Sequence, residues 1–367
     1  MAFEARPRAG LVHIVTGSFG AGHDAAAREI ALRFEARGYE TRTWDIVDLF
    51  PAGIGRALRA AFLFQLRTAP ETWGLLLHGL RPGGLAHRVA TSGLAITHTR
   101  LRALTVPEPD VIVSTHPFAS QALGQMRASG TLDVQVVTYL TDMSVHPMWV
   151  HPAVDLHLAL HEVPASQARR WHGRTTVVRP LVPGVYAAPS PPVPSREEHR
   201  RRLGLPTAGP LLLVTGGSRG IGPLERAARD IAATGVAKPV VLCGHNRALF
   251  DRLAGDPSIG RLGWRDDIPV LMRAVDGVVQ NAGGFLSLEA LAAGTPAVTY
   301  RCVPGHGETN AAALDRAGLI PWARSQEELT TQLIRALTGR QHPHGLAAGG
   351  SVDIVDAVFP QRARVPA

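Results

Sequence analysis

A glycine-rich segment near the N-terminus ends in a histidine and carries the first candidate chemistry. It reads TGSFGAGHD over residues 16–24, and a helical AAAREI segment follows. Glycines let a ligand approach the backbone closely, and a helix N-terminus offers free N–H groups and a positive dipole. The dipole disfavours imidazolium, so His23 stays neutral and able to accept a proton near pH 7. The pattern predicts a general base at His23, oriented by Asp24 or another carboxylate; a loop histidine that caps its own helix is the alternative.

A second glycine-rich segment, TGGSRGIG over residues 215–222, lies between an apolar run and a helix expected from about Pro223. Its four glycines within seven residues exceed what a simple turn requires, which favours contact between the backbone and a phosphate. The first segment has the spacing GxxGxG in place of the dinucleotide GxGxxG. Asp45 is a candidate for the acidic residue that a dehydrogenase needs, so a dinucleotide site stays a weak alternative.

The elements that must position these turns are strands alternating with helices. Short apolar or β-branched runs occur at 11–16, 41–44, 111–114, 135–139, 211–215, 239–243, 277–280 and 297–300. Runs of this length without alternation indicate strands buried on both faces, as in a parallel sheet covered by helices. Together with the helical patterns between them, they predict an α/β fold built from βαβ units.

One proline-rich stretch divides the chain. Residues 187–194 read AAPSPPVP, which suits neither a helix nor an interior strand. Directly after it, SREE at 195–198 is a capping box that opens a short helix ending near Gly204. We predict an N-terminal acceptor-binding domain over 1–186, a linker over 187–195 and a C-terminal donor-binding domain over 196–345. A tail over 346–367 follows, and its return to the N-terminal domain is one option.

Composition limits the class of protein. Of the 367 residues, 45% are hydrophobic and 19% charged, which is typical of a folded protein with two domains. The net charge of +8, carried almost wholly by arginine, suits an anionic partner such as phospholipid, nucleotide or nucleic acid. The two cysteines show no disulfide or metal spacing, and no apolar run reaches the roughly 18–20 residues of a membrane span. These features predict a cytoplasmic protein, with the inner face of the membrane as the alternative location.

Four further motifs follow in the C-terminal half, each at the end of an expected strand or the start of the next helix. They are CGHN at 243–246, GWRDDI at 263–268, NAGGFLSLEA at 281–290 and PGHGETN at 304–310. Open α/β sheets bind ligands at this edge. Residues 281–284 open a helix, and Glu289 lies about one turn further on. Helix N–H groups can therefore meet a diphosphate while the Glu289 carboxylate accepts hydrogen bonds from ribose hydroxyls.

In this order the motifs resemble the donor domain of GT-B glycosyltransferases, and in particular the monogalactosyldiacylglycerol synthase and MurG-type family. The N-terminal half agrees through GAGH at 20–23, STHP at 114–117 and TDMSVHPMW at 141–149. The resemblance implies an inverting transferase with two Rossmann-like domains facing a central cleft. Such an enzyme moves a hexose or N-acetylhexosamine from a UDP-sugar to a hydroxyl of a lipid-linked or small-molecule acceptor, without a cofactor.

The resemblance also implies a role for each motif. His23 is the base that deprotonates the acceptor hydroxyl, the second glycine turn faces the diphosphate, and Glu289 holds the ribose. The backbone over 264–268 meets the uracil, and the 304–310 loop contacts the donor sugar. The donor-binding residues so predicted are Gly216, Gly217, Ser218, Arg219, Gly244, Asn246, Trp264, Ile268, Asn281, Gly283, Gly284, Glu289, His306, Gly307, Glu308 and Asn310. The acceptor-binding residues so predicted are Gly20, Gly22, His116, Asp142, His146 and Trp149.

Two features qualify the donor chemistry. The family usually has Gln-Glu after Pro-Gly, whereas this chain has His306-Gly307, which leaves the identity of the sugar open. The chain has no Asp-x-Asp, the usual device for chelating a cation to the diphosphate. We therefore expect no metal site, with helix dipoles, glycine N–H groups and Arg219 stabilising the departing UDP.

The acceptor side allows more than one interpretation. Apolar Ile54, Leu58, Phe62 and Leu66 are interleaved with Arg56, Arg59 and Arg67 within a segment spanning 51–102. This pattern fits peripheral contact with an anionic membrane, and equally a core-facing helix with a charged outer face. His116, His146 and Asp142 lack a regular metal-ligand spacing, so we expect them to line the acceptor cleft or to fix loops there.

Two rival functions stay open at this point. One is a UDP-sugar epimerase or hydrolase on the same fold, which would turn over without an acceptor. The other is a basic protein that binds membrane or nucleic acid and keeps a vestigial nucleotide pocket. The chain lacks the mixed aromatic and basic surface motifs of nucleic-acid readers. The expected partners are thus a UDP-sugar, a hydroxyl acceptor and an anionic membrane, with no nucleic acid.

Overall fold

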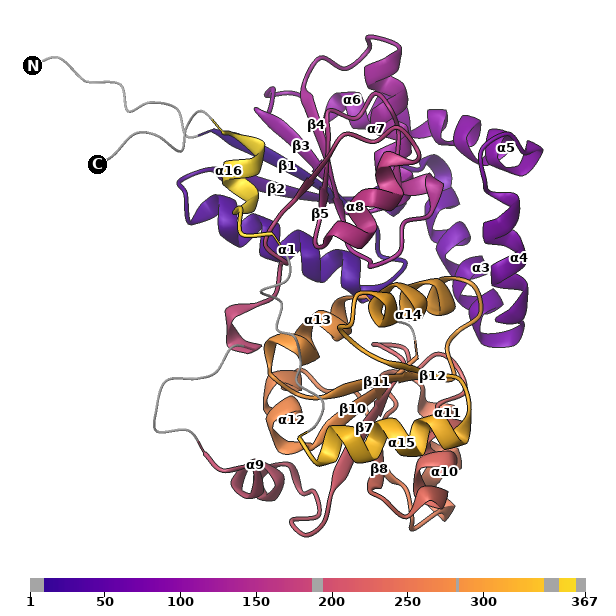
Figure 1. The fold of residues 1–367 in the computed structure, drawn as a ribbon. Coiled ribbons are helices and arrows are strands. Elements are labelled where there is room, and N and C mark those ends of the chain that lie inside the picture. The colour runs from indigo at the N-terminus through magenta and orange to yellow at the C-terminus, as the bar shows by residue number, and fades with distance from the viewer. Residues whose placement is uncertain (1–9, 187–193, 282–283, 340–349, 361–367) are drawn as a thin grey trace, which may run out of the picture.

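The computed structural model describes residues 10–186, 194–281, 284–339 and 350–360, which form two parallel six-stranded sheets (Figure 1). The first sheet has the order β2-β1-β3-β4-β5-β6 and the second β12-β11-β10-β7-β8-β9. Each sheet belongs to one half of the chain, and helices cover both. The predicted α/β fold with two Rossmann-like domains is confirmed.

Strand bounds follow the apolar runs closely. In the first sheet the strands are β1 Leu11–Thr16, β2 Glu40–Asp45, β3 Val111–Ser114, β4 Gln135–Leu140, β5 Leu156–Ala159 and β6 Thr175–Val177. In the second they are β7 Leu211–Thr215, β8 Lys238–Leu242, β9 Gly260–Leu262, β10 Gly277–Gln280, β11 Ala297–Tyr300 and β12 Trp322–Ala323. All eight predicted runs are strands, whereas β5, β6, β9 and β12 were missed because two to four residues give too short a pattern.

Helices connect the strands and pack on the sheets. Those of the N-terminal half are α1 Ala21–Glu35, α2 Ile46–Leu49, α3 Ile54–Thr68, α4 Glu71–Gly79, α5 Leu85–Gly93, α6 His98–Ala103, α7 Pro117–Ala128 and α8 Glu162–Arg169. Those of the C-terminal half are α9 Arg196–Leu203, α10 Leu224–Thr234, α11 Arg247–Arg252, α12 Ile268–Ala274, α13 Phe285–Ala292, α14 His306–Arg316 and α15 Gln326–Leu337. In Figure 1, α3, α4 and α5 form a group of helices beside the N-terminal domain, and α4 contacts α14 of the second domain.

Helix α9 begins where the predicted capping box lies. The Ser195 side chain accepts a hydrogen bond from the Glu198 N–H, and Gly204 ends the helix with a φ of +67°. Both features were predicted. Of the predicted linker, residues 187–193 lie outside the described residues.

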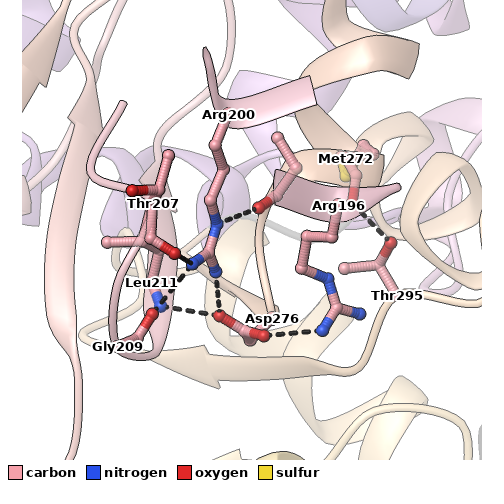
Figure 2. Close-up of polar contacts among 9 residues, drawn as sticks. Arg196, Arg200, Thr207, Gly209, Leu211, Met272, Asp276 and Thr295 are labelled. Carbon is pink, nitrogen blue, oxygen red and sulfur yellow. Dashed lines mark hydrogen bonds and ion pairs between the residues drawn. The ribbon is translucent and has the colours of Figure 1, made fainter. Parts of the chain in front are cut away.

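A buried arginine ties α9 to the base of the second sheet (Figure 2). Arg200 is 5% exposed, and its guanidinium donates to the carbonyl oxygens of Ala274 at 2.8 Å and Gly209 at 2.9 Å. It also pairs with Asp276, whose carboxylate accepts from the Leu211 N–H at 2.7 Å. This network holds the first helix after the linker against the start of the central strand.

The last described helix, α16 Ile354–Val358, lies against the N-terminal domain (Figure 1). Asp356 accepts from Arg37 at 3.0 Å, and the Phe359 ring stacks on Tyr39 with centroids 5.2 Å apart. The Arg179 N–H also donates to the Val352 carbonyl at 2.8 Å. Residues 350–360 therefore contact the first domain; residues 346–349 and 361–367 of the predicted tail lie outside the described residues.

We expect Arg200→Met to lower the free energy of unfolding by about 3 kcal/mol, because the Ala274 and Gly209 carbonyls lose their buried donor. The half-buried Asp276 carboxylate also loses one of its two cations and keeps only the exposed Arg196, 2.7 Å away. Urea unfolding followed by fluorescence measures this change. Arg201→Met is the matched control on the same helix, since Arg201 pairs with Glu197 at 3.6 Å with both side chains more than 60% exposed. That change should cost no more than about 1 kcal/mol, and equal losses for the two variants would contradict the anchoring role.

Candidate active site

The loops after β1 and β4 meet the N-termini of α13 and α14 across the domain boundary. A Cβ on Gly22 would lie 3.4 Å from Phe285, and a Cβ on Gly284 would lie 3.1 Å from the Asp142 carboxylate. The Ser144 N–H donates to the Asn310 amide oxygen at 2.8 Å, and the Ser144 hydroxyl lies 2.9 Å from that of Thr309. The site is therefore assembled from both domains.

His23 occupies the first turn of α1 at this boundary. Its Nδ1 lies 2.9 Å from the Thr115 carbonyl oxygen, which can only accept, so Nδ1 carries the proton and donates. Nε2 is then the basic nitrogen, and it has no hydrogen-bond partner among the described residues. Burial lowers the pKa of His23 below the ordinary histidine value, although the nearby Asp142 carboxylate opposes this. The ring is thus neutral near pH 7 and able to accept a proton at Nε2.

The expected orienting carboxylate is absent from His23 Nδ1. Asp24 instead accepts from the Thr16 hydroxyl at 2.9 Å, on the strand that precedes the turn. The prediction that Asp24 or another carboxylate orients His23 is wrong for the bond at Nδ1, because the Thr115 backbone carbonyl accepts it. Every residue has a backbone carbonyl, so no feature of the sequence pointed to Thr115 as the partner of His23.

Aromatic rings surround His23. The His116 ring centroid lies 4.9 Å away and that of Trp149 5.7 Å away. Phe19 stacks on His116 at 4.9 Å and meets Phe62 of α3 edge-on at 5.7 Å. An apolar wall therefore runs from the catalytic candidate to the outer helices, and Phe19 is a lining residue that the sequence did not single out.

The two histidines before prolines fix loops. The Nδ1 atoms of His116 and His146 accept from the N–H groups of Phe118 and Met148 at 3.2 Å each. Both rings thus cap the helical turns that follow them. His146 Nε2 also donates to the Leu77 carbonyl at 2.8 Å, which ties its loop to α4. Gly20 is the N-cap residue of α1. His116, Asp142 and Trp149 lie around His23 in the first turn of that helix.

The loop that follows β8 packs against the second glycine turn. Gly217, Gly220 and Gly222 have φ values of +74°, +54° and +92°, which explains the choice of glycine. The Asn246 amide donates to the Gly220 carbonyl at 3.0 Å, and a Cβ on Gly244 would lie 2.2 Å from the Ser218 carbonyl. Asn246 and Gly244 therefore shape the turn that carries Gly216, Gly217, Ser218 and the exposed Arg219.

An aromatic pair stands beside this turn. The Trp264 side chain is 53% exposed and stacks on His245, with centroids 4.2 Å apart and planes 10° from parallel. Ile268, half-buried, begins α12. Asn281 is 2% exposed, and its amide donates to the Ile221 carbonyl at 2.7 Å, linking the β10 loop to the glycine turn. Gly283 lies outside the described residues.

Glu289 meets a tyrosine that the sequence did not suggest. Tyr186, 5% exposed and just before the predicted linker, hydrogen-bonds the Glu289 carboxylate. Burial raises the pKa of Glu289 to about 7, and the Tyr186 hydrogen bond opposes that rise. The Glu289 carboxyl therefore changes charge near neutral pH.

The prediction of a loop over 304–310 is wrong, because most of this segment is the start of helix α14. Gly305, with a φ of +76°, is the N-cap residue of α14, and His306, Gly307, Glu308 and Asn310 form its first turns. The Glu308 carboxylate accepts from the Gly305 N–H at 3.1 Å, which is the N3 half of a capping box. Asn310 is fully buried and joins Ser144 of the other domain.

Two further observations concern metal and membrane. Within residues 10–186, 194–281, 284–339 and 350–360, no group of three or more His, Cys, Asp and Glu side chains is arranged to hold a metal ion. Over the same residues, no helix combines the length and apolarity that crossing a bilayer requires.

Comparison with known proteins agrees with the fold and with the ordered motifs. A family model described as monogalactosyldiacylglycerol (MGDG) synthase matches residues 23–177. The probable monogalactosyldiacylglycerol synthase of Nicotiana tabacum is 25% identical, covering 95% of this chain and 69% of that protein. A processive diacylglycerol beta-glucosyltransferase of Bacillus mycoides is 23% identical, covering 87% of this chain and 83% of that protein. The chain spans 63–69% of the length of the plant relatives.

Solved glycosyltransferase structures share the whole architecture. Anabaena HepE (Alr3699), solved with UDP-glucose, matches with a TM-score of 0.56 at 16% identity, covering 96% of this chain and 98% of that one. MurG of Acinetobacter baumannii matches with a TM-score of 0.53 at 15% identity, covering 97% and 100%. Fold, motifs and relatives define a glycosyltransferase of the GT-B class. Within that class the resemblance to the monogalactosyldiacylglycerol synthase family, with MurG among the structural neighbours, is confirmed.

Proposed function

We propose that this chain transfers a hexose or N-acetylhexosamine from a UDP-sugar to a lipid hydroxyl, with inversion at the anomeric carbon and without a bound metal. One observation carries the proposal: His23 is a neutral, inward-facing base with a fixed tautomer, placed where the two domains meet. A base at that boundary can act on an acceptor held by the first domain and a donor held by the second.

The proposed reaction is a single displacement. Nε2 of His23 takes the proton of the acceptor hydroxyl as the hydroxyl oxygen bonds to the anomeric carbon. The bond between that carbon and the UDP oxygen breaks on the opposite side, and UDP leaves with the electron pair. The positive N-terminus of α13, the glycine turn over 216–218 and Arg219 stabilise the leaving diphosphate. Glu289 is proposed to hold the ribose.

A diacylglycerol-like lipid is the acceptor that the surroundings of His23 favour. The relatives from Nicotiana tabacum and Bacillus mycoides carry diacylglycerol in their names. In this chain the aromatic wall of Phe19, Phe62 and His116 offers apolar surface beside the base. The relatives' names include both galactosyl and glucosyl transfer. Because His306 stands in place of the family's glutamine, galactose and glucose are both candidates for the donor sugar.

The outer helices supply a surface on which a membrane can rest. Of the fourteen large apolar side chains that are exposed in the described chain, eight lie between residues 54 and 96. The most exposed of these eight are Leu75 and Leu85, each at 75%, and Phe64 at 67%. Exposed apolar groups interleaved with Arg56, Arg67, Arg81 and Arg88 suit peripheral binding to an anionic membrane. Helix α3 thus exposes apolar as well as charged side chains on its outer side.

We expect His23→Ala to lower kcat by about 10²-fold or more, as for the loss of a general base. UDP should still raise the melting temperature of the variant, since the donor side is untouched. His172→Asn is the matched control: this exposed residue has a φ of +64°, which asparagine tolerates, and lies far along the chain from the site. Unchanged transfer by His23→Ala would contradict the proposal, and sugar release that needs no acceptor would favour an epimerase or hydrolase.

UDP-glucose affinity should fall about tenfold between pH 8 and pH 6, as the fraction of ionised Glu289 falls around its pKa of about 7. The carboxylate accepts hydroxyl hydrogen bonds more strongly when charged. Titration calorimetry measures this change, and Glu289→Gln should bind more weakly with no such pH dependence. The Tyr186 hydrogen bond lowers the pKa of Glu289 in the native chain. Tyr186→Phe removes this bond, so the variant should keep the pH dependence but move its midpoint to higher pH. The same pH dependence in Glu289→Gln would remove the ribose role.

The double variant Leu75→Ser with Leu85→Ser should bind anionic vesicles at least about tenfold more weakly, because two apolar side chains no longer insert. Co-sedimentation with phosphatidylglycerol–phosphatidylcholine vesicles measures the binding, which should also weaken at high salt. Leu32→Ser is the matched control, since Leu32 is 58% exposed on α1, away from these helices. Equal binding by all three proteins would rule out this membrane surface.

A further inference from the structure

Two histidines from opposite domains share one buried carboxylate. Asp142, 8% exposed, follows β4, and its Oδ2 lies 3.6 Å from Nε2 of His306 at the start of α14. Asp142 also acts electrostatically on His23, and Thr141 next to it reaches to 3.4 Å from His23 Nδ1. Asp142 thus interacts with both the proposed base and an imidazole that the other domain supplies.

The partners of His306 give its ring two distinct states. Asn310 accepts from the Ser144 N–H through its amide oxygen, so its NH2 group is the end that faces His306 Nε2, at 3.1 Å. A neutral His306 can accept from that NH2 group. A protonated ring has no lone pair there, so it turns its charge to the Asp142 carboxylate instead. Asn310 lies on the same helix as His306, whereas Asp142 reaches His306 only because the two domains are in contact.

The pKa shifts of the three groups agree with this pairing of His306 and Asp142. Burial works against a charged His306 ring, but Asp142 outweighs it and raises the pKa of His306. Burial likewise works against a charged Asp142, but His306 outweighs it and lowers the pKa of that carboxyl. For His23, burial lowers the pKa, Asp142 raises it and His306 lowers it. The two domains therefore influence the base in opposite directions.

Three other ionisable groups lie near His23, Asp142 and His306, and each has a hydrogen-bond partner of its own. Asp24 is bonded by the Thr16 hydroxyl. His116 lies against His23, but burial holds its pKa well below the ordinary value and its Nδ1 caps α7. His146 lies near His306, and its ring is held between the Met148 N–H and the Leu77 carbonyl. Asp142 therefore acts on His23 from within its own domain, and His306 acts on it across the boundary.

We propose that Asp142 and His306 are positioning residues for the base: docking of α14 delivers an imidazole to Asp142, and this pairing sets how strongly Asp142 holds a proton on His23. The inference rests on the proposed role of His23. When the domains separate, Asp142 acts on His23 alone and favours its protonated form. When they close, the His306 cation offsets Asp142 and frees Nε2 to accept the proton of the acceptor. Base strength is thereby coupled to domain closure.

The acid limb of kcat/KM against pH tests this coupling, because it reports the pKa of the free enzyme's base. His306→Gln removes the cation, so the limb should move to higher pH by about one unit, and Asp142→Asn should move it to lower pH by a similar amount. In Asp142→Asn, added His306→Gln should change little, since His306 without its counter-ion stays neutral. Limbs that stay in place, or that move in the same direction, would overturn the proposal.

Histidine ring resonances test the pair without relying on activity. In the full chain labelled with ¹³C-histidine, the His306 and His23 signals are assigned by their loss in His306→Gln and His23→Ala. His306 should titrate above the ordinary histidine value and fall in Asp142→Asn, while His23 should rise in His306→Gln. Unchanged ring titrations in these variants would overturn the proposal even where activity is lost.

Thr309→Val is the matched control for a purely structural interface. It removes the hydrogen bond between the Thr309 and Ser144 hydroxyls but carries no charge. The acid limb and both ring titrations should stay as in the native chain. A shift equal to that of His306→Gln would attribute the effect to loosened docking and overturn the proposal. Native protein without transferase activity would instead reject the proposed function, and the ring titrations would still decide the pair.

Discussion

A neutral, half-buried imidazole at the meeting of two domains is the constraint on which the rest of the site depends. His23 can serve as a base only if Nδ1 is occupied and Nε2 is free, and the Thr115 carbonyl meets the first condition. That carbonyl is placed by β3, which pairs directly with β1, the strand that leads into the first glycine turn. The parallel register of two neighbouring strands therefore fixes the tautomer of the base.

The second domain contributes through close backbone contacts. Glycine at Gly22, Gly284 and Gly305 lets α1, α13, α14 and α4 approach one another, since a Cβ on Gly305 would lie 2.7 Å from Gly74. The helix N-termini of the donor domain thus point at the loops of the acceptor domain. The same proximity brings His306 to Asp142 and Tyr186 to Glu289, so each half of the site is completed by a residue of the other half or of the segment joining them.

The fold was largely predictable because its signals are local. Buried parallel strands such as β1 and β7 are continuous apolar runs, and the start of α9 carries its own capping box. The short strands β6 and β9 are half-buried and three residues long, which is too little for a pattern to stand out. The resemblance implied a loop over 304–310, whereas α14 begins at His306 and Glu308 caps it.

The sequence by itself determined the class of protein, the two sheets and the turn that carries His23, since each depends on residues that are neighbours in the chain. Only the tertiary structure decided that Thr115 rather than Asp24 orients the base, that Tyr186 meets Glu289, and that His306 faces Asp142. These pairings join residues from about 90 to more than 160 positions apart. Their physical cause is the packing of strand ends and helix N-termini across the sheets and the domain boundary, which no local pattern of residues records.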